Sequence, residues 1–370
     1  MAGGALEEKR RSLAGMGEIK MLKFYKGKRV FVTGYTGFKG SWLCKMLLLA
    51  GAEVTGYALP PTELSLFHLT GLEQQMHFVL GDIRDLDSLK YAFDAAKPEI
   101  VFHLAAQPIV RESYRDPVGT YSTNIMGTVH ILECVRQSES VRSFLNVTTD
   151  KVYENHRWPW GYRETDRLNG FDPYASSKSC SELVTDSYRN SFLEDRCVAV
   201  STARAGNVIG GGDFAADRII PDCIRAVQSG SVIQVRNPYS VRPYQHVLEP
   251  LSAYLLIAQK QYEDGSLSGS YNVGPDSRDC LTTGELAELF CKAWGSPARW
   301  EHIGESNHPH EDAILRLDSS KIASVLGWKP RWNAERAVQA TVLWTKAWLE
   351  GRDVNGCLEQ QITEFLAQSI

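Results

Sequence analysis

The sequence has no paired cysteine motif. Its eight cysteines never stand as C-x-x-C, and most of them lie inside apolar runs. Unpaired cysteines are among the most buried residue types, and thiols stay reduced in the cytoplasm. The pattern therefore predicts buried, reduced thiols in a cytoplasmic protein.

Long apolar runs and an excess of positive charge are also missing. No segment approaches the roughly 20 apolar residues that span a bilayer, so no membrane association is expected. The net charge of −4 argues against a nucleic-acid surface, and the basic residues 9–11 directly follow two acidic ones. Residues 1–23 lack a sustained apolar core, which predicts a mobile N-terminal tail rather than a signal peptide.

A Walker A loop is excluded because it needs the order Gly-Lys-Ser, whereas this chain has Lys39-Gly40-Ser41. The residues that are present favour an ordinary globular protein, with 43% hydrophobic and 23% charged side chains. A chain of 370 residues with this composition can bury one large core or two modest ones.

Short apolar runs alternate with helical patterns over the first half of the chain. The expected strands are 29–33, 54–59, 77–80, 100–105, 144–148 and 198–203. Helices are expected to begin near Ser41, Leu86, Pro117 and Tyr174. This alternation predicts an α/β fold, a Rossmann-type doubly wound parallel sheet covered by helices on both faces.

The rhythm changes after residue 205, where glycine-rich and proline-bearing loops precede helical patterns at 283–294, 319–327 and 333–350. We therefore expect a smaller, mostly helical second domain built from segments that leave and re-enter the first. The predicted division is 24–205 plus about 242–275 for the first domain. The second takes about 206–241 plus 276–368.

Three glycines follow the first expected strand. Gly34, Gly37 and Gly40 would let the backbone turn tightly and approach a pyrophosphate at the N-terminus of the next helix. This strand, loop and helix context predicts a dinucleotide site. The second strand does not end in the acidic residue that binds a ribose, and Lys39 could favour an extra phosphate, so NAD and NADP both stay open.

Asp82 closes the third expected strand. It is a candidate contact to an adenine, and capping of the helix that begins near Leu86 is the alternative.

A strand that ends in Thr149-Asp150-Lys151 is followed by Tyr174 and Lys178. A spacing of four places Tyr174 and Lys178 on one face of a helix. An acid, a phenol and two amines in this short stretch can support both redox and elimination chemistry. Taken alone, the same residues could be an ordinary helix face and a helix-capping turn.

Several motifs occur together in a fixed order. They are Gly34/Gly37/Gly40, Gly81-Asp82-Ile83, His103-Leu104-Ala105-Ala106, Asn124, Thr149-Asp150-Lys151 and Tyr174/Lys178. With these motifs the chain resembles the extended short-chain dehydrogenase/reductase family from about Lys26 to Trp344. Within it, the chain is similar to the 4,6-dehydratases that act on CDP-glucose. The residues that carry this likeness are Gly37-Phe38-Lys39-Gly40-Ser41-Trp42, Gln107-Pro108, Lys151 and His308-Pro309-His310-Glu311.

The resemblance implies a lyase with a bound NAD that is reduced and reoxidised within each turnover. The implied reaction converts CDP-D-glucose to CDP-4-dehydro-6-deoxy-D-glucose plus water, on a bacterial route to the dideoxyhexoses of lipopolysaccharide O-antigen. It also implies a homodimer or homotetramer. The first domain would bind NAD and the second the nucleotide sugar.

The resemblance also assigns roles to residues. Tyr174 would be the base at the sugar 4-hydroxyl, assisted by Thr149 and Lys178. Asp150 would be the acid of the elimination and Lys151 its base, either directly as a neutral amine or through Tyr174 or a water. The implied cofactor-binding residues are Gly34, Gly37, Phe38, Lys39, Gly40, Asp82, Ile83, Leu104, Ala105, Ala106, Thr123, Tyr174 and Lys178. The implied substrate-binding residues are Gln107, Asn124, Asn207, Arg218, Arg242, His310 and Glu311.

Three alternatives remain at this point. A nucleotide-sugar 4-epimerase of the same family is the nearest, although epimerases need no acid–base pair where this chain has Asp150-Lys151. A 4,6-dehydratase for another nucleotide hexose and an NAD-binding regulator are the others. His308, His310, Glu311 and Asp312 could suggest a metal site, but a substrate-lining loop explains them better, so no metal is predicted.

Overall fold

The computed structural model describes residues 20–304 and 313–368. The prediction of a mobile tail over residues 1–23 is wrong for its last residues, because α2 (Lys20–Tyr25) is a helix. Leu22 and Tyr25 are buried, and the Tyr25 hydroxyl donates to the carbonyl of Leu255 at 2.6 Å. Two apolar side chains one turn apart therefore anchor this segment to the body of the protein.

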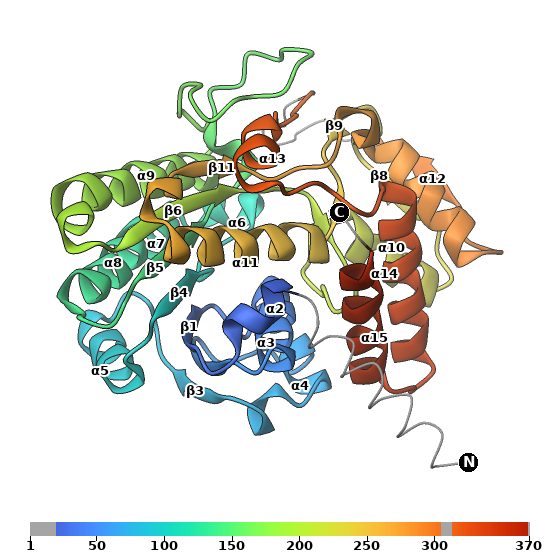
Figure 1. Cartoon of the computed structure of the whole chain (residues 1–370). Coiled ribbons are helices and arrows are strands. Elements are labelled where there is room, and N and C mark those ends of the chain that lie inside the picture. The colour runs from blue at the N-terminus through green and yellow to red at the C-terminus, as the bar shows by residue number, and fades with distance from the viewer. Residues whose placement is uncertain (1–19, 305–312, 369–370) are drawn as a thin grey trace.

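A seven-stranded parallel sheet forms the centre of the molecule (Figure 1). Its strands run in the order β11-β6-β5-β4-β1-β2-β3, so the chain winds outward in both directions from β1 and β4. The strands are β1 (Arg29–Thr33), β2 (Glu53–Ala58), β3 (His77–Leu80), β4 (Ile100–His103), β5 (Ser143–Val147), β6 (Ala199–Arg204) and β11 (Ser270–Asn272). This confirms the predicted doubly wound fold, with six of the twelve predicted strand ends shifted by one residue and β4 ending two residues earlier than predicted.

Helices cover both faces of the sheet (Figure 1). One face carries α5 (Leu86–Ala96), α8 (Gly127–Gln137) and α9 (Pro173–Tyr188). The other carries α2, α3 (Phe38–Leu49) and α11 (Leu248–Glu263). The helix expected from Pro117 is divided into α7 (Pro117–Tyr121), a π-helical turn (Ser122–Met126) and α8.

A second group of elements lies beyond the carboxyl ends of the strands. It contains α10 (Ile219–Gln228), α12 (Thr283–Trp294) and α14 (Ala334–Leu349), which share one apolar core with the pair β8 (Ile233–Val235) and β13 (Trp300–His302). The other α-helices and strands of the described residues are α4 (Leu66–Leu69), α6 (Val110–Arg115), α13 (Ser320–Leu326), α15 (Val354–Ala367), β7 (Val208–Ile209), β9 (Val241–Arg242), β10 (Gln245–His246) and β12 (Leu281–Thr282).

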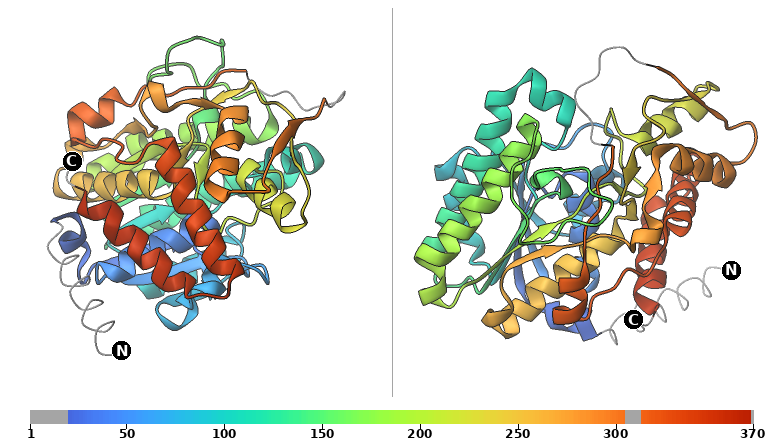
Figure 2. Two further views of the ribbon diagram at one scale, coloured as in Figure 1. Left: turned by 90° about the vertical axis from the view of Figure 1, so that its right-hand side faces the viewer. Right: turned by 90° about the horizontal axis from the view of Figure 1, so that it is seen from above.

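The helix α15 was not among the expected elements. It packs on α14 and returns to the sheet domain (Figure 2), where Glu359 pairs with Lys45 of α3 at 2.9 Å. Leu358, Ile362 and Phe365 belong to the same apolar core as the buried residues of α3 and α11. The two predicted domains thus share a core at this point, and their exact boundaries stay a prediction.

Glu249, at the start of α11, is a fully buried acid with incomplete partners. Its Oε1 accepts the backbone N–H groups of Arg331 and Trp332 at 2.9 and 2.6 Å. Its Oε2 has no hydrogen-bond partner among the described residues. Burial raises the pKa of Glu249 to about 7, although these two N–H groups and the charge of Arg331 lower it.

This raised pKa makes stability depend on pH. The native carboxyl keeps its proton between its ordinary pKa of 4.5 and about 7, whereas the unfolded chain releases it. The free energy of unfolding should therefore fall as pH rises through this window, by about 1.4 kcal/mol for each unit of pKa difference. We expect Glu249→Gln to remove that part of the slope in urea unfolding measured at several pH values. Glu263→Gln, on the exposed end of the same helix, should keep it, and equal slopes for Glu249→Gln and the wild type would contradict the assignment.

Candidate active site

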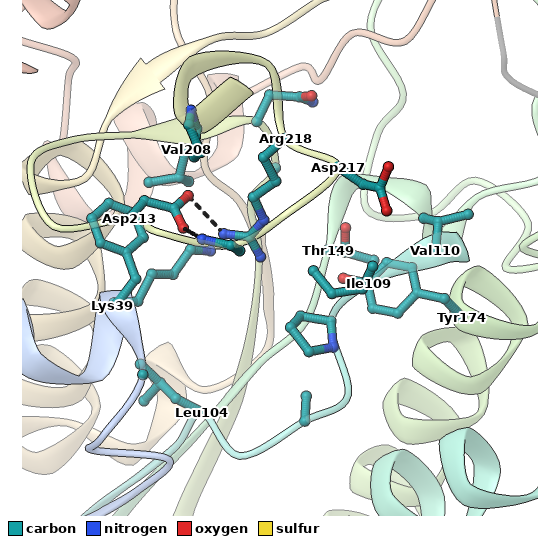
Figure 3. A pocket seen from close by; sticks show the side chains of 18 of the residues that line it. Lys39, Leu104, Ile109, Val110, Thr149, Tyr174, Val208, Asp213, Asp217 and Arg218 are labelled. Atoms are coloured by element: carbon teal, nitrogen blue, oxygen red, sulfur yellow. Dashed lines mark hydrogen bonds and ion pairs between the residues drawn. The ribbon is translucent and has the colours of Figure 1, made fainter. Parts of the chain in front are cut away.

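A cavity of about 1580 Å³ opens at the carboxyl ends of the parallel strands (Figure 3). Its floor includes the loops that follow β1, β4, β5 and β6, and its far wall comes from α10 and the segment around β8. The strand order reverses between β1 and β4, which is where doubly wound sheets bind ligands.

The glycine loop forms one end of this cavity. Gly34 has φ of 73°, and a Cβ atom there would lie 2.7 Å from the backbone nitrogen of Ala105. A Cβ atom at Gly40 would lie 2.2 Å from the carbonyl oxygen of Gly34. The helix begins at Phe38, three residues before the expected start, so Gly40 sits inside its first turn and packs on the loop.

Gly37 is the N-cap of α3 and has no side chain to fill that end of the helix. Unpaired N–H groups and the helix dipole favour an anion at this point. The loop therefore fits the pyrophosphate of a dinucleotide. Gly34, Gly37, Phe38, Lys39 and Gly40 all line the cavity, as predicted for cofactor-binding residues.

Lys39 points from α3 into the cavity (Figure 3). Burial, and then the positive charges of Arg218 and Lys178, lower its pKa to about 7. An amine with this pKa gains a proton readily when an anion arrives nearby.

Asp82 and Ile83 also line the cavity. The alternative of Asp82 as the cap of α5 is wrong, because Asp85 is the N-cap and accepts the N–H of Ser88 at 3.0 Å. Asp82 instead holds Arg84, whose hydrogen bonds lower the pKa of the carboxyl. A contact to the adenine stays a prediction for Asp82.

The loop after β4 is fastened beneath the glycine loop. The N–H groups of Leu104 and Ala105 both donate to Thr33 Oγ1 at 3.2 Å. Leu104, Ala105 and Ala106 line the cavity together with Thr123 of the π-helical turn. The structure thus brings these predicted cofactor-binding residues to the same cavity as the glycine loop.

Tyr174 and Lys178 lie on consecutive turns of α9, as their spacing predicted. Lys178 is buried and donates from Nζ to the carbonyl of Val147 at 3.1 Å, and burial lowers its pKa to about 8. Burial also raises the pKa of Tyr174 to about 12, against the lowering effects of Thr149 and Arg218. In the protein alone the phenol is therefore protonated at neutral pH, so the phenolate must depend on positive charge brought by a ligand.

The residues after β5 surround one buried carboxylate. Asp150 is fully buried, its Oδ1 accepts from Thr149 Oγ1 at 2.9 Å, and its Oδ2 accepts from Asn207 Nδ2 at 2.8 Å. The Nζ of Lys151 lies 3.6 Å from Asp150 Oδ1. A Cβ atom at Gly206 would lie 2.1 Å from Asp150 Cγ, so only glycine leaves room for this carboxylate.

The predicted substrate-binding residues divide into three groups. Asn207, Arg218 and Arg242 line the cavity, and Arg218 donates to Asp213 Oδ2 at 2.9 Å (Figure 3). Gln107 and Asn124 do not line it.

Gln107 and Asn124 bind each other instead. The N–H of Gln107 donates to Asn124 Oδ1, and Asn124 Nδ2 donates to Ser177 Oγ, both at 2.8 Å. This arrangement favours support of the loop after β4 rather than substrate contact, which stays a prediction.

His310 and Glu311 lie outside the described residues. Within residues 20–304 and 313–368, no three His, Cys, Asp or Glu side chains come together as a metal site. The absence of a metal therefore stays a prediction.

Two buried charged residues near Tyr174 and Lys178, Glu182 and Arg204, were not among the predicted site residues. Glu182 and Arg204 form a buried ion pair at 2.9 Å, and Arg204 Nη1 donates to the hydroxyl of Tyr153 at 2.8 Å. One signal was available, because Glu182 follows Lys178 by the same four residues that separate Lys178 from Tyr174. Arg204 offered none, since its partners are distant in sequence.

The fold and the Tyr174–Lys178 pair define an enzyme of the extended short-chain dehydrogenase/reductase class. The family model described as GDP-mannose 4,6 dehydratase matches residues 31–341. The chain therefore belongs to the extended short-chain dehydrogenase/reductase family, which confirms the resemblance predicted from its motifs.

Individual proteins extend this likeness. The CDP-glucose 4,6-dehydratase of Salmonella typhimurium is 48% identical over 351 residues, which cover 93% of this chain and 98% of that protein. The dTDP-D-glucose 4,6-dehydratase of Mus musculus is 29% identical and covers 86% of this chain and 88% of its own length.

Solved structures show the same fold. The UDP-glucose 4-epimerase of Thermus thermophilus, a complex with NAD, has a TM-score of 0.75 at 25% identity, covering 86% of this chain and 98% of that one. The dTDP-glucose 4,6-dehydratase of Bacillus anthracis, also in complex with NAD, has a TM-score of 0.74 at 21% identity, covering 87% and 98%. Among the described residues of this chain, no helix is both long and apolar enough to cross a membrane.

The crowded position of Gly40 predicts a binding defect. Gly40→Ala should weaken NAD binding at least tenfold, about 1.4 kcal/mol, because the new methyl group must push the loop away from the pyrophosphate. Fluorescence titration with NAD measures this. Gly265→Ala is a matched control, since its Cβ atom would meet nothing within 4 Å, and unchanged affinity in Gly40→Ala would contradict the assigned loop.

Proposed function

We propose that this chain is an NAD-dependent lyase that converts CDP-D-glucose to CDP-4-dehydro-6-deoxy-D-glucose and water. The observation that carries the proposal is the placement of an acid–base pair, Asp150 and Lys151, beside Tyr174 and Lys178 at one cavity. The 48% identity to a CDP-glucose 4,6-dehydratase supports both the reaction and the nucleotide.

The first step oxidises the sugar at C4. Tyr174 takes the proton of the 4-hydroxyl while Thr149, whose hydrogen bond lowers the pKa of the phenol, holds the same oxygen. A bound NAD would supply the acceptor for the hydride of C4 and the donor of the hydride for C6. Lys178 is buried in α9, lines the same cavity and would hold the ribose of that cofactor.

The second step removes water across C5 and C6. A proton that moves from the Lys151 ammonium to the Asp150 carboxylate over their 3.6 Å separation leaves a neutral amine and a neutral acid. The amine then takes the C5 proton, which the C4 ketone has acidified, and the acid protonates the departing 6-hydroxyl. Both side chains return to their charged forms. Return of the hydride to C6 also requires a proton at C5, and the proton that Tyr174 took from the 4-hydroxyl balances it, so all three side chains are restored within the turnover.

The choice of NAD over NADP rests on the relatives. β2 ends without an acidic residue for the ribose, so the fingerprint leaves both open. The NAD complexes of structural neighbours support NAD. Titration of the purified protein with NAD and NADP in parallel tests this choice.

Purified protein with CDP-glucose should release water and form a 4-keto product detectable by mass spectrometry and by its alkaline absorbance. A panel of CDP, dTDP, UDP and GDP sugars tests the nucleotide, with the fastest turnover expected for CDP-glucose. Formation of CDP-galactose as the only product would favour a 4-epimerase and overturn the proposal. No reaction and no reduction of bound NAD with any sugar would favour an NAD-binding regulator.

Replacement of Lys151 separates the two steps. Lys151→Met should still show sugar-dependent reduction of bound NAD by absorbance, while product formation falls by about 10²-fold or more because the C5 base is gone. Lys260→Met, which removes an exposed lysine far along α11, should behave as the wild type. Normal product formation by Lys151→Met would remove this residue from the elimination.

We also propose a cytoplasmic homodimer or homotetramer that serves the synthesis of dideoxyhexoses for lipopolysaccharide O-antigen. Exposed apolar side chains gather on adjacent helices of one face, with Val118 and Tyr121 on α7 and Leu183 on α9. Leu183 and Val118 are 57% and 78% exposed, and their position on adjacent helices makes them part of a patch rather than isolated exposed side chains. Burial of this face against a second copy explains its composition.

An acidic residue on this face should split the oligomer. Leu183→Asp is expected to reduce the mass measured by light scattering to that of a monomer, because a carboxylate cannot be buried in an apolar interface. Leu343→Asp, at a position on α14 with a similar exposure of 50%, should leave the mass unchanged. A wild-type protein that is itself monomeric would contradict the proposal.

A further inference from the structure

A buried ion pair lies outside the proposed steps. Glu182 on α9 and Arg204 at the end of β6 are each 3% exposed, and their Oε2 and Nη2 atoms are 2.9 Å apart. Removing two charges from water is costly, and apolar side chains of similar size often do as well. The pair therefore calls for a role beyond stability.

The Glu182 carboxylate ties three elements together. Its Oε1 accepts the hydroxyl of Thr148, which directly precedes Thr149. Its Oε2 accepts the hydroxyl of Thr202 on β6 at 2.7 Å, beside the bond from Arg204. One carboxylate thus fastens α9 to the carboxyl ends of β5 and β6, where the reacting groups emerge.

Glu182 also acts on Lys178. It lies one turn further along the same face of α9, and its negative charge raises the pKa of Lys178 against the effect of burial. The other groups that face Lys178 are Lys39 on α3, His103 on β4 and Tyr174 on its own helix. Burial and the charge of Lys178 hold the pKa of His103 at about 3, so this imidazole is neutral.

Arg204 extends the contact to the cavity wall. Its Nη1 donates to the hydroxyl of Tyr153, and its guanidinium lies 5.2 Å from the centre of that ring. Tyr153 lines the cavity. Arg204 partly neutralises Glu182, so the field at Lys178 depends on both members of the pair.

We propose that Glu182 is a positioning residue of the reaction. Through Thr148 and Thr202 it sets the ends of β5 and β6 beneath the Tyr174–Lys178 pair, and its charge keeps Lys178 an ammonium. Arg204 partly neutralises the charge of Glu182. The inference rests on the proposed function, because it gives Lys178 its task in the oxidation of the sugar.

Substitutions of Glu182 and of Arg204 should shift the alkaline limb of the pH profile in opposite directions. Glu182→Gln removes the negative charge, so Lys178 should lose its proton at lower pH. The alkaline limb of the profile for NAD reduction by CDP-glucose should then move down by about one pH unit. Arg204→Gln leaves the Glu182 charge without its partner, so the same limb should move up. A purely structural role would lower the rates of both variants without moving the limbs in opposite directions.

A second measurement follows Lys178 without turnover. The pH at which an amine reagent labels Lys178, read by peptide mass spectrometry, should move in the same two directions. Thr185→Ala is the matched control, because Thr185 is buried one turn further along α9 and ties the helix to Asn146 without carrying charge. Thr185→Ala should lower the stability of the protein and leave both the alkaline limb of the pH profile and the labelling midpoint of Lys178 unchanged.

The outcomes distinguish failure of the proposed function from failure of the positioning role of Glu182. No reduction of NAD by the wild type with any nucleotide sugar would overturn the proposed function, while the labelling experiment would still report on Glu182. Normal turnover by the wild type with the same labelling midpoint in Glu182→Gln would overturn the positioning role alone. If Glu182→Gln does not fold, an unshifted or downward-shifted midpoint in Arg204→Gln overturns the role as well.

Discussion

The parallel alignment of seven strands is the constraint on which the site depends. Because every strand runs in the same direction, the loops after β1, β4, β5 and β6 all emerge at one edge of the sheet. The glycine loop, the turn after β4 and the Thr149-Asp150-Lys151 run are distant in sequence, yet they meet at one cavity. Helices on both faces keep water from the sheet and leave this edge as the place where a ligand can enter.

The chemistry at that edge is governed by burial. Burial moves the pKa values of Tyr174, Lys178 and Lys39 in the direction that favours their neutral forms, so that at neutral pH Tyr174 is a phenol and Lys39 carries only part of its charge. A charged ligand that binds in such a site changes the pKa values of these side chains and therefore their protonation. Asp150 has its two oxygens held by Thr149 and Asn207, which fixes the orientation of this carboxylate before any ligand arrives.

Much of this could be predicted from the sequence because the signals were local. The glycine loop, the alternation of strands and helices, and the spacing of Tyr174 and Lys178 each involve neighbours along the chain. The sequence predicts a start of α3 at Ser41, three residues after the observed start at Phe38, because glycine is a poor helix former and Gly40 lies in the first turn. Asp82 was a plausible cap of α5, and only the structure shows Asp85 in that role.

Long-range contacts were not predictable in the same way. Arg204 meets Glu182 and Tyr153 only because β6, α9 and the turn after β5 converge. The approach of Gly206 to Asp150 also depends on two different strands. Gln107 and Asn124 matched a family pattern, but the pattern did not reveal that they bond to each other.

The return of α15 to the sheet domain has a consequence for how the protein is made. Leu358, Ile362 and Phe365 complete the same core as α3 and α11, although they are synthesised long after β1. While the ribosome is still translating the second group of elements, the apolar surface of the first therefore stays partly uncovered. The core of the sheet domain is therefore completed only after α15 has been synthesised and has docked.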